Sequence, residues 1–399
     1  MTMPAILAGS EWRGALAALV FAALSTVGIF AGGADAALTI GLAAVLLLAG
    51  IPARTTPALD RSLALLAALF ILLLWVGLLW SIAPQRTMRG ALQLTGLLVA
   101  ALVLIGEREP LRRSADLIFR VALGAAIVGS ALAFFDFVTG HPIMRHVLAH
   151  PELPGVLDTK FDRGFTYESV LIWPIVAAGW AAGRRGLAVA ALAVLAAALA
   201  MSHTDAARLA FVVGLAALAL AALAPRIAAG ALTLGVALAV ATPVFVAAFA
   251  RQLIPLANGV KHSFAHRLEI WDYMTGRVWE RPLLGWGWWS AQAVPIRSEE
   301  LARYLYVSPA GSPHPHNQWL QLWVETGVLG ALLGTAFALI ILYRALKLDR
   351  RHRPFALACF AAAMVPSLAS FDLGADSWWC TLAATGLLWR LLPAPPERR

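Results

Sequence analysis

Long apolar runs follow one another along most of the chain, separated by short stretches that contain Arg, Pro and Gly. A run of ~20 apolar residues has the length of a helix that spans the hydrocarbon core of a bilayer. The pattern predicts an all-α polytopic membrane protein with about twelve transmembrane helices. No soluble domain interrupts the runs, so we expect residues 1–399 to form a single membrane domain. The predicted spans are 14–31, 36–51, 62–83, 90–106, 115–138, 165–183, 186–201, 209–224, 227–250, 319–343, 355–371 and 377–392.

Composition agrees with this pattern and excludes one function that the net charge suggests. Hydrophobic residues make up 60% of the chain and charged residues only 13%, against ~25% charged residues in soluble domains. The formal net charge of +9 is typical of nucleic-acid-binding proteins. Here, however, the Lys and Arg residues are dispersed among short loops, which indicates membrane topology and not a nucleic-acid-binding surface.

The distribution of basic residues predicts the orientation of the spans. If the N-terminus is cytoplasmic, most basic clusters fall on the cytoplasmic side, as the positive-inside rule requires, and the C-terminus is cytoplasmic as well. These clusters are Arg54 with Arg61, Arg108 with Arg112 and Arg113, Arg184 with Arg185, Arg226, the run from Arg344 to Arg353, and Arg398 with Arg399.

A second group of basic residues falls on the outer side and opposes the topological bias. Its members are Arg86, Arg89, Lys160, Arg163 and Arg208, together with the long loop 251–318. Long loops cross the membrane regardless of charge. Arginines in short outer loops instead suggest an anionic partner, or contact with lipid headgroups. Eight of the nine histidines share this side, which would be periplasmic or extracellular.

Residues 251–318 form the single long periplasmic loop of the predicted topology. Within it, residues 267–280 place apolar side chains at helical spacing, which predicts an amphipathic helix on the membrane surface. Pro282 ends this helix, and Gly285 and Gly287 permit a sharp turn. The tryptophans that follow, Trp286, Trp288 and Trp289, are expected in an interfacial aromatic belt or on a sugar-stacking surface.

The stretch from Ser312 to Gly330 carries the main candidate for chemistry. Pro315 keeps the backbone extended before His316, and Asn317 is a suitable N-cap for the span that follows. His316 would therefore lie at the positive end of a helix, which disfavours the imidazolium form and favours an anionic ligand. A neutral imidazole can act as general base on a sugar hydroxyl, although a structural histidine bonded to a loop carbonyl is an equal alternative.

Neighbouring residues admit further interpretations. His314 could orient His316, or the two could bind a metal, as could His146 with His150. Because no acidic or cysteine set completes such a site, we expect no metal and no cofactor. Glu325, nine residues into the span, is expected to pair with an arginine and stabilise the bundle. Gly330 and Gly334 are expected to permit close helix packing.

Two arginines on the outer side are candidates for binding a diphosphate. Arg208 ends the short turn that starts at Ser202, and Arg267 begins the amphipathic helix. Guanidinium groups bind phosphate oxygens bidentately. Two or three of them could hold a lipid-linked diphosphate and neutralise it as a leaving group.

The order of these motifs resembles one family. His316-Asn317, nine residues, Gly327, two residues and Gly330 is similar to the signature of bacterial lipopolysaccharide O-antigen ligases, within the superfamily of O-antigen ligases and polymerases. Arg208, Arg267 and the stretch 282–287 occupy family-like positions upstream. Ala207 departs from the pattern, because a serine often precedes this arginine. The resemblance spans roughly residues 160–335.

The resemblance implies an enzyme that moves polysaccharide from undecaprenyl diphosphate to a sugar of lipid A–core, at the periplasmic face of the inner membrane. It implies that His316 is the base on the acceptor hydroxyl, supported by His314 and Asn317. Arg208 and Arg267 would bind the diphosphate, with Arg163 as a further candidate. Transfer would be inverting and independent of metal and nucleotide. An O-antigen polymerase, a related protein glycosyltransferase and a small-anion transporter remain alternatives.

Overall fold

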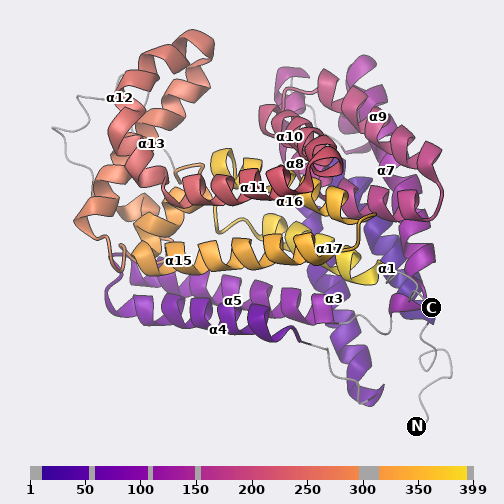
Figure 1. Cartoon of the computed structure of the whole chain (residues 1–399), viewed down its shortest axis with the longest axis horizontal. Helices are drawn as coiled ribbons and strands as arrows, with labels where there is room; N and C mark the ends of the chain where they lie inside the picture. The colour runs from indigo at the N-terminus through magenta and orange to yellow at the C-terminus, as the bar shows by residue number, and fades with distance from the viewer. Residues whose placement is uncertain (1–10, 54–58, 107–110, 149–153, 296–313, 393–399) are drawn as a thin grey trace.

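The computed structural model describes residues 11–53, 59–106, 111–148, 154–295 and 314–392. Within these ranges every regular element is a helix, so the all-α prediction is confirmed (Figure 1). The longer helices are α1 (Glu11–Leu24), α3 (Ala34–Ala53), α4 (Arg61–Val76), α5 (Pro84–Gly106), α7 (Ala115–Val138), α8 (Pro154–Ala181), α9 (Arg185–Met201), α10 (Asp205–Leu223), α11 (Pro225–Val240), α12 (Thr242–Val260), α13 (His262–Glu280), α15 (Gln318–Lys347), α16 (Arg353–Ala369) and α17 (Asp376–Leu391). Short elements are α2 (Val27–Phe30), η2 (Gly77–Leu79), η3 (Ile143–Val147) and η4 (Ala291–Ala293).

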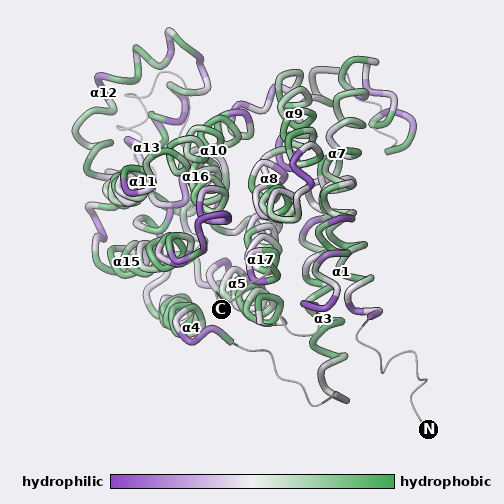
Figure 2. The backbone as a smooth tube through the Cα atoms, turned by 45° about the vertical axis from the view of Figure 1, so that its right-hand side comes forward, coloured by the Kyte–Doolittle hydropathy of each residue, from purple (hydrophilic) through white to green (hydrophobic). Residues whose placement is uncertain are grey.

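Several of these helices have the length and composition of membrane spans. Among the described residues, 7 helical stretches are long and apolar enough to cross a bilayer. Four shorter apolar helices accompany them, in α3, α9, α11 and α16. The hydropathy of the backbone is mostly hydrophobic along these helices, with hydrophilic stretches mainly at their ends (Figure 2). The chain is therefore a multi-pass membrane protein, while the count of about twelve spans stays a prediction.

One predicted span is wrong. The range 227–250 is divided at Ala241, where α11 ends, and Pro243 lies in the first turn of α12. A proline is well tolerated in the first turn of a helix but cannot continue the hydrogen bonding of a preceding one. Helix α12 then runs to Val260, so the first ten residues of the predicted loop 251–318 are helical.

Helices α12 and α13 form a hairpin at one end of the molecule, on the left of Figure 1. Helix α13 covers the predicted amphipathic segment and starts five residues earlier, at His262. It buries Ile270, Met274 and Val278 against α15 and the segment after α13, and it also buries the polar residues Glu269 and Arg277. The amphipathic helix predicted within 251–318 is therefore present, although it packs on the protein body.

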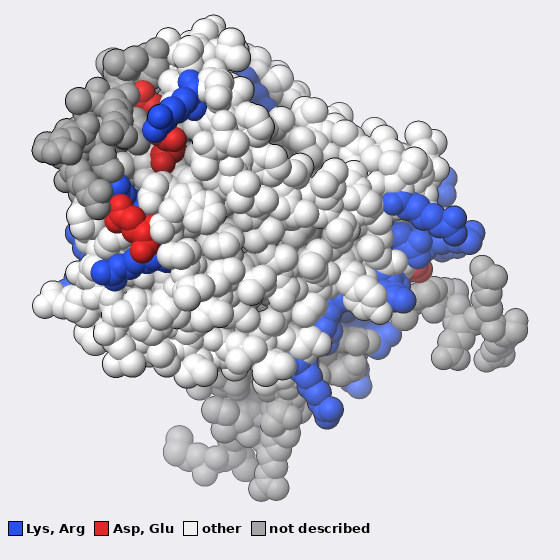
Figure 3. Space-filling model, turned by 60° about the vertical axis from the view of Figure 1, so that its left-hand side comes forward, with Lys and Arg blue, Asp and Glu red and all other residues white. Residues whose placement is uncertain are grey.

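Segments that the charge pattern predicts on the same side of the membrane contact one another in the structure. At one end, Arg184, the N-cap of α9, lies 3.0 Å from Asp116 of α7, and both Arg344 of α15 and Arg390 of α17 pair with Asp60. In the view of Figure 3, charged residues gather toward opposite ends, and a broad surface without Lys, Arg, Asp or Glu lies between them. This arrangement fits a protein whose middle faces lipid.

At the opposite end, segments predicted on the outer side contact one another. Thr204 donates to Asp162 at 2.7 Å, and Arg86 donates to Gln292 at 2.7 Å. Lys261, between α12 and α13, pairs with Asp205 at the start of α10. These contacts between predicted outer segments agree with the charge pattern.

Helix α15 is broken at Gly327, where the segment after α13 inserts against it. Gly327 has φ 64° and ψ −160°, a conformation that only glycine adopts readily. On either side of the break, the inserted segment bonds to α15: Trp286 N donates to Val324 O at 2.9 Å, and Val328 N donates to Pro282 O at 2.8 Å. Gly327 therefore allows the inserted segment to bond to α15. This role differs from the helix packing expected of the glycines in this span.

We expect Gly327→Ala to destabilise the protein strongly. An alanine Cβ would lie 2.3 Å from the Leu283 carbonyl oxygen, and the required backbone conformation is strained for any L side chain. Together these effects should lower the free energy of unfolding by about 3 kcal/mol. Thermal unfolding of the detergent-solubilised protein measures the change.

Gly334→Ala is the matched control on the same helix. Its Cβ would meet only the mobile end of the Leu322 side chain, at 2.6 Å, and its backbone is helical. We expect little change in its melting temperature. Equal melting temperatures for the two variants would contradict the role assigned to Gly327.

Candidate functional site

The segment 314–317 leads into α15 with an unusual backbone. Asn317 is the N-cap, as predicted, and its side chain accepts a hydrogen bond from Leu320 N at 3.0 Å. His316 has a φ of 53°, in the left-handed region that few non-glycine residues occupy. Such a conformation is retained where surrounding contacts enforce it, often at functional sites.

Contacts from two sides enforce this conformation. Trp271 of α13 donates through Nε1 to the Pro315 carbonyl at 2.7 Å. The backbone N–H of His316 donates to Nδ1 of His314 at 3.1 Å, and the two imidazole rings lie 4.1 Å apart between centroids. His314 therefore contacts His316 directly, through both backbone and ring.

The hydrogen bond at Nδ1 of His316 fixes which nitrogen can act as a base. Nδ1 lies 3.2 Å from the carbonyl oxygen of Ser370, at the end of α16. Because a carbonyl oxygen only accepts, Nδ1 carries the proton in the neutral ring and Nε2 keeps its lone pair. The sequence left two roles open for His316, a structural hydrogen bond to a loop carbonyl and a general base. The structure is compatible with both, because Nδ1 makes the hydrogen bond and Nε2 stays basic.

The surroundings of His316 favour the neutral ring. Burial, helped by electrostatic interaction with His314, Arg267 and His266, lowers the pKa of His316 to about 4, although the bond to Ser370 opposes the shift. Burial likewise lowers the pKa of His314. Near neutral pH both rings are therefore uncharged.

Two arginines on different helices act electrostatically on this pair of histidines. Arg267 of α13 acts on His316, and Arg163, near the start of α8, acts on His314. Arg163 is exposed, whereas Arg267 is about half buried, and burial lowers the pKa of its guanidinium below the usual value. A guanidinium remains a cation throughout the range in which proteins function. The site thus combines neutral imidazoles with fixed positive charges.

Arg208 has a different setting from the other two predicted arginines. Its Nε donates to the carbonyl of Leu199 at 2.7 Å and its Nη2 donates to that of Ala200 at 2.9 Å, so it caps the C-terminus of α9. These bonds use two of its five N–H groups. Asp205, one turn earlier on α10, acts electrostatically on Arg267, which places this turn beside α13. The interactions of Arg208 itself are with α9.

The sequence interpretation missed a polar network that joins the start of α15 to the turn between α16 and α17. Gln318 donates to the backbone carbonyl of Asp372 at 3.2 Å. Gln321 donates to the carboxylates of both Asp372 and Glu325, at 3.0 and 3.1 Å, and accepts from Leu373 N. Polar residues at 317, 321 and 325 recur every four positions in an apolar helix, and this spacing was the available signal.

The predicted partner of Glu325 is wrong. This side chain is 1% exposed, and it accepts hydrogen bonds from the backbone N–H groups of Trp289 at 3.0 Å and Ala291 at 3.4 Å, as well as from Gln321. No arginine forms an ion pair with it among the described residues. Glu325 therefore holds the segment that inserts at Gly327.

The predicted surface role of the tryptophans is also wrong for two of them. Trp286 is 7% exposed and Trp288 is 1% exposed, because the inserted segment folds into the protein against α5, α13 and α15. Trp289 is partly buried and packs against Gly374. Side chains in this setting build the framework of the site and leave sugar stacking to other groups.

Metal ligands were a further alternative in the sequence. In the described part of the chain, no group of three or more His, Cys, Asp or Glu side chains has the arrangement of a metal site. At His314 and His316 the Nδ1 atoms already take part in hydrogen bonds. His150, the partner considered for His146, lies outside the described residues.

Comparison with known proteins finds matches that include the same region. The family model described as O-antigen ligase matches residues 190–335. A protein of Rickettsia conorii named "Putative polysaccharide ligase" is 28% identical over 141 residues, which cover 34% of this chain and 33% of that protein. One of the same name from Rickettsia typhi is 30% identical over 128 residues, covering 30% of each.

These matches confirm the resemblance that the sequence interpretation used, over about a third of the chain. The chain spans about a third of the length of the curated relatives that it matches. The matched region carries Arg208, Arg267 and His316 and the break at Gly327. Residues 190–335 of this chain are therefore similar to the O-antigen ligase family.

Proposed function

We propose that this protein is a glycosyltransferase that joins O-antigen polysaccharide, carried on undecaprenyl diphosphate, to a sugar hydroxyl of lipid A–core. The observation that carries the proposal is the neutral His316 ring, with Nδ1–H bonded to Ser370 and cationic side chains beside it. The protein would lie in the bacterial inner membrane with both termini cytoplasmic. The His316 end would face the periplasm, where donor and acceptor lipids meet.

His316 acts as general base in the proposed reaction. Its Nε2 removes the proton of the acceptor hydroxyl while that oxygen attacks the anomeric carbon of the donor sugar. The new carbon–oxygen bond forms as the bond from the same carbon to the diphosphate oxygen breaks. Attack opposite the leaving group inverts the anomeric centre. The proton remains on His316 until solvent removes it, and the lipid diphosphate leaves with the electron pair.

The arginines stabilise the negative charge that develops on the leaving diphosphate. Arg267 and Arg163 act on the two histidines from separate helices, so a diphosphate beside His316 lies within the field of both. Charge-assisted hydrogen bonds from guanidinium groups supply the stabilisation that a divalent cation supplies elsewhere. Arg208 contributes with the N–H groups that α9 does not use, and holds the turn that carries Asp205.

Reconstitution of the purified protein tests the proposal. Undecaprenyl-diphosphate-linked glycan and lipid A–core are supplied together in liposomes that contain EDTA, and a gel shift of the acceptor reports ligation. We expect the acceptor to shift, with release of undecaprenyl diphosphate. Elongation of the donor glycan without modification of lipid A–core would instead identify a polymerase and overturn the assigned acceptor.

A further inference from the structure

A cavity of about 580 Å³ lies between α4, α5, α15, α16 and α17, and neither His316 nor the arginines assigned to the donor line it. This volume is within the range of ~300–1,000 Å³ of ligand-binding pockets. Its walls are almost entirely aliphatic and aromatic, and they include Phe70, Leu98, Phe337 and Phe360. Such walls exclude a polar ligand from most of the volume and favour a hydrocarbon chain.

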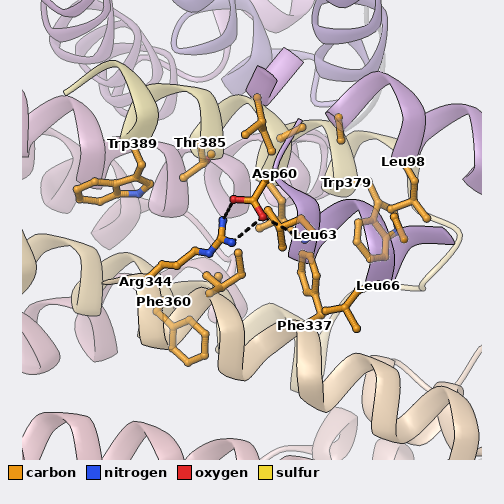
Figure 4. A pocket seen from close by; sticks show the side chains of 18 of the residues that line it. Asp60, Leu63, Leu66, Leu98, Phe337, Arg344, Phe360, Trp379, Thr385 and Trp389 are labelled. Atoms are coloured by element: carbon orange, nitrogen blue, oxygen red, sulfur yellow. Dashed lines mark hydrogen bonds and ion pairs between the residues drawn. The ribbon is translucent and has the colours of Figure 1, made fainter. Parts of the chain in front are cut away.

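One end of the cavity is polar (Figure 4). Arg344 of α15 forms two hydrogen bonds with the Asp60 carboxylate, and Arg390 of α17 lies 3.8 Å from the same group. Two guanidinium groups thus lie beside one carboxylate at this end. The side chains of Arg344 and Arg390 are 35% and 30% exposed, so this end is open at the surface.

A hydroxyl group about halfway along the α17 wall has no partner. Thr385 lines the cavity on α17, one turn before Trp389, and is 5% exposed. Its Oγ1 is buried and makes no hydrogen bond in the structure. A buried polar atom without a partner is unfavourable by ~1–3 kcal/mol, and an oxygen atom of a bound headgroup or ester would satisfy it. The charged end therefore marks the place for a polar head, and Thr385, five residues before Arg390, lies where an ester oxygen of the same lipid could reach it.

The length of the cavity fits a chain from one leaflet. From Trp379 to Arg390 on α17, the lining extends over ~16 Å at ~1.5 Å per residue. The hydrocarbon thickness of one leaflet, half of a core of ~30 Å, is about equal to this length. A single acyl chain thus reaches from the polar end to the far wall.

We propose that this cavity binds an anionic phospholipid from the leaflet on the Asp60 side, with its phosphate at Arg344 and Arg390 and one acyl chain among the apolar walls. The site lies at the end opposite to His316 and is separate from glycosyl transfer. The phosphate would add a second anion to a cluster that contains two cations. The chain would fill a space that the helices leave between α4 and the rest of the bundle.

Native mass spectrometry of the full protein, with added phosphatidylglycerol or phosphatidylcholine of identical chains, tests this site. One arginine near an anionic lipid surface contributes ~1 kcal/mol, or about fivefold in affinity. We expect at least that preference for phosphatidylglycerol. Arg390→Gln should abolish the preference and retain weak binding of both lipids, while Ala363→Phe, which fills the cavity, should abolish binding of both.

Two variants serve as matched controls. Arg350→Gln removes an exposed arginine of the same end that does not line the cavity, and Ala216→Phe enlarges an exposed alanine on α10. Both should bind lipid as the unmodified protein does. Equal retention of the two lipids by the unmodified protein, or an unchanged preference in Arg390→Gln, would overturn the proposal. Displacement of phosphatidylglycerol by undecaprenyl phosphate at lower concentration would also overturn it, since the cavity would then hold a polyprenyl chain.

Discussion

His316→Ala is expected to lower the rate of polysaccharide transfer to lipid A–core by about a thousandfold. The substitution removes Nε2, the only ring nitrogen of this residue with a free lone pair, since Nδ1 carries the proton that is bonded to Ser370. It leaves the N-cap at Asn317 and the bond from Trp271 to Pro315 in place. Initial rates in the reconstituted system, with both substrates saturating, measure the loss.

His262→Ala provides the control for this substitution. His262 is an exposed histidine at the start of α13, and its loss should change the rate by less than about twofold, as for most surface substitutions. The melting temperatures of both variants should match that of the unmodified protein. A rate for His316→Ala within tenfold of the unmodified rate would show that another group is the base.

Arg267→Ala is expected to weaken the enzyme for its donor by about 30-fold in kcat/KM, because a charge-assisted hydrogen bond to phosphate contributes ~2 kcal/mol. Arg267 acts on His316 from α13 and is about half buried, so its charge is only partly screened. Arg267→Lys should recover part of the loss, since a lysine keeps the charge but not the bidentate geometry. Kinetics at varied donor concentration separate the effect on KM from that on kcat.

Arg251→Ala is the matched control for Arg267→Ala. Arg251 is an exposed arginine on α12, the other helix of the same hairpin, so it reports any general effect of charge on the approach of the donor. We expect its kinetics to be unchanged at physiological salt. Equal losses in Arg251→Ala and Arg267→Ala would contradict a specific contact at Arg267.

The features that the sequence predicted correctly depend on local signals. Asn317 caps α15 because its side chain accepts a hydrogen bond from an N–H three residues later. Both residues are close in the sequence, so the cap can be predicted from a short stretch of it. The amphipathic segment in α13 follows from the spacing of Ile270, Met274 and Val278. The contacts between loops agree with the distribution of basic residues along the chain, while the orientation that the positive-inside rule predicts stays a prediction.

The features that the sequence did not predict depend on contacts between distant segments. Glycine at 327 is compatible with a packing position or with a break. Only the hydrogen bonds from Pro282 and Trp286 to the residues around it reveal the break. In the same way, the sequence around Glu325 is compatible with an ion pair. Only the structure shows that backbone N–H groups of the inserted segment bond to its carboxylate. Two of the three tryptophans of that segment are buried for the same reason.

The candidate site shows the same division. His316, Arg267 and Arg163 were candidates from residue type and position, and the structure gives each of them an electrostatic interaction within one cluster. Ser370 and Asp372 lie more than 50 residues further along the chain, in the turn between α16 and α17, and carry no motif of their own. Their part in holding His316, Gln318 and Gln321 appears only when α16 and α17 pack beside α15.

The pH dependence of kcat/KM tests most directly whether His316 acts as a neutral base. This parameter reports ionisations of the free enzyme, and the base is competent only above its pKa. Because burial lowers the pKa of His316 to about 4, the profile should be flat from neutral pH down to about pH 5 and fall only near pH 4, provided that the protein remains folded. A fall centred near pH 6.5, the ordinary value for histidine, or a profile unchanged by His316→Ala, would contradict the account.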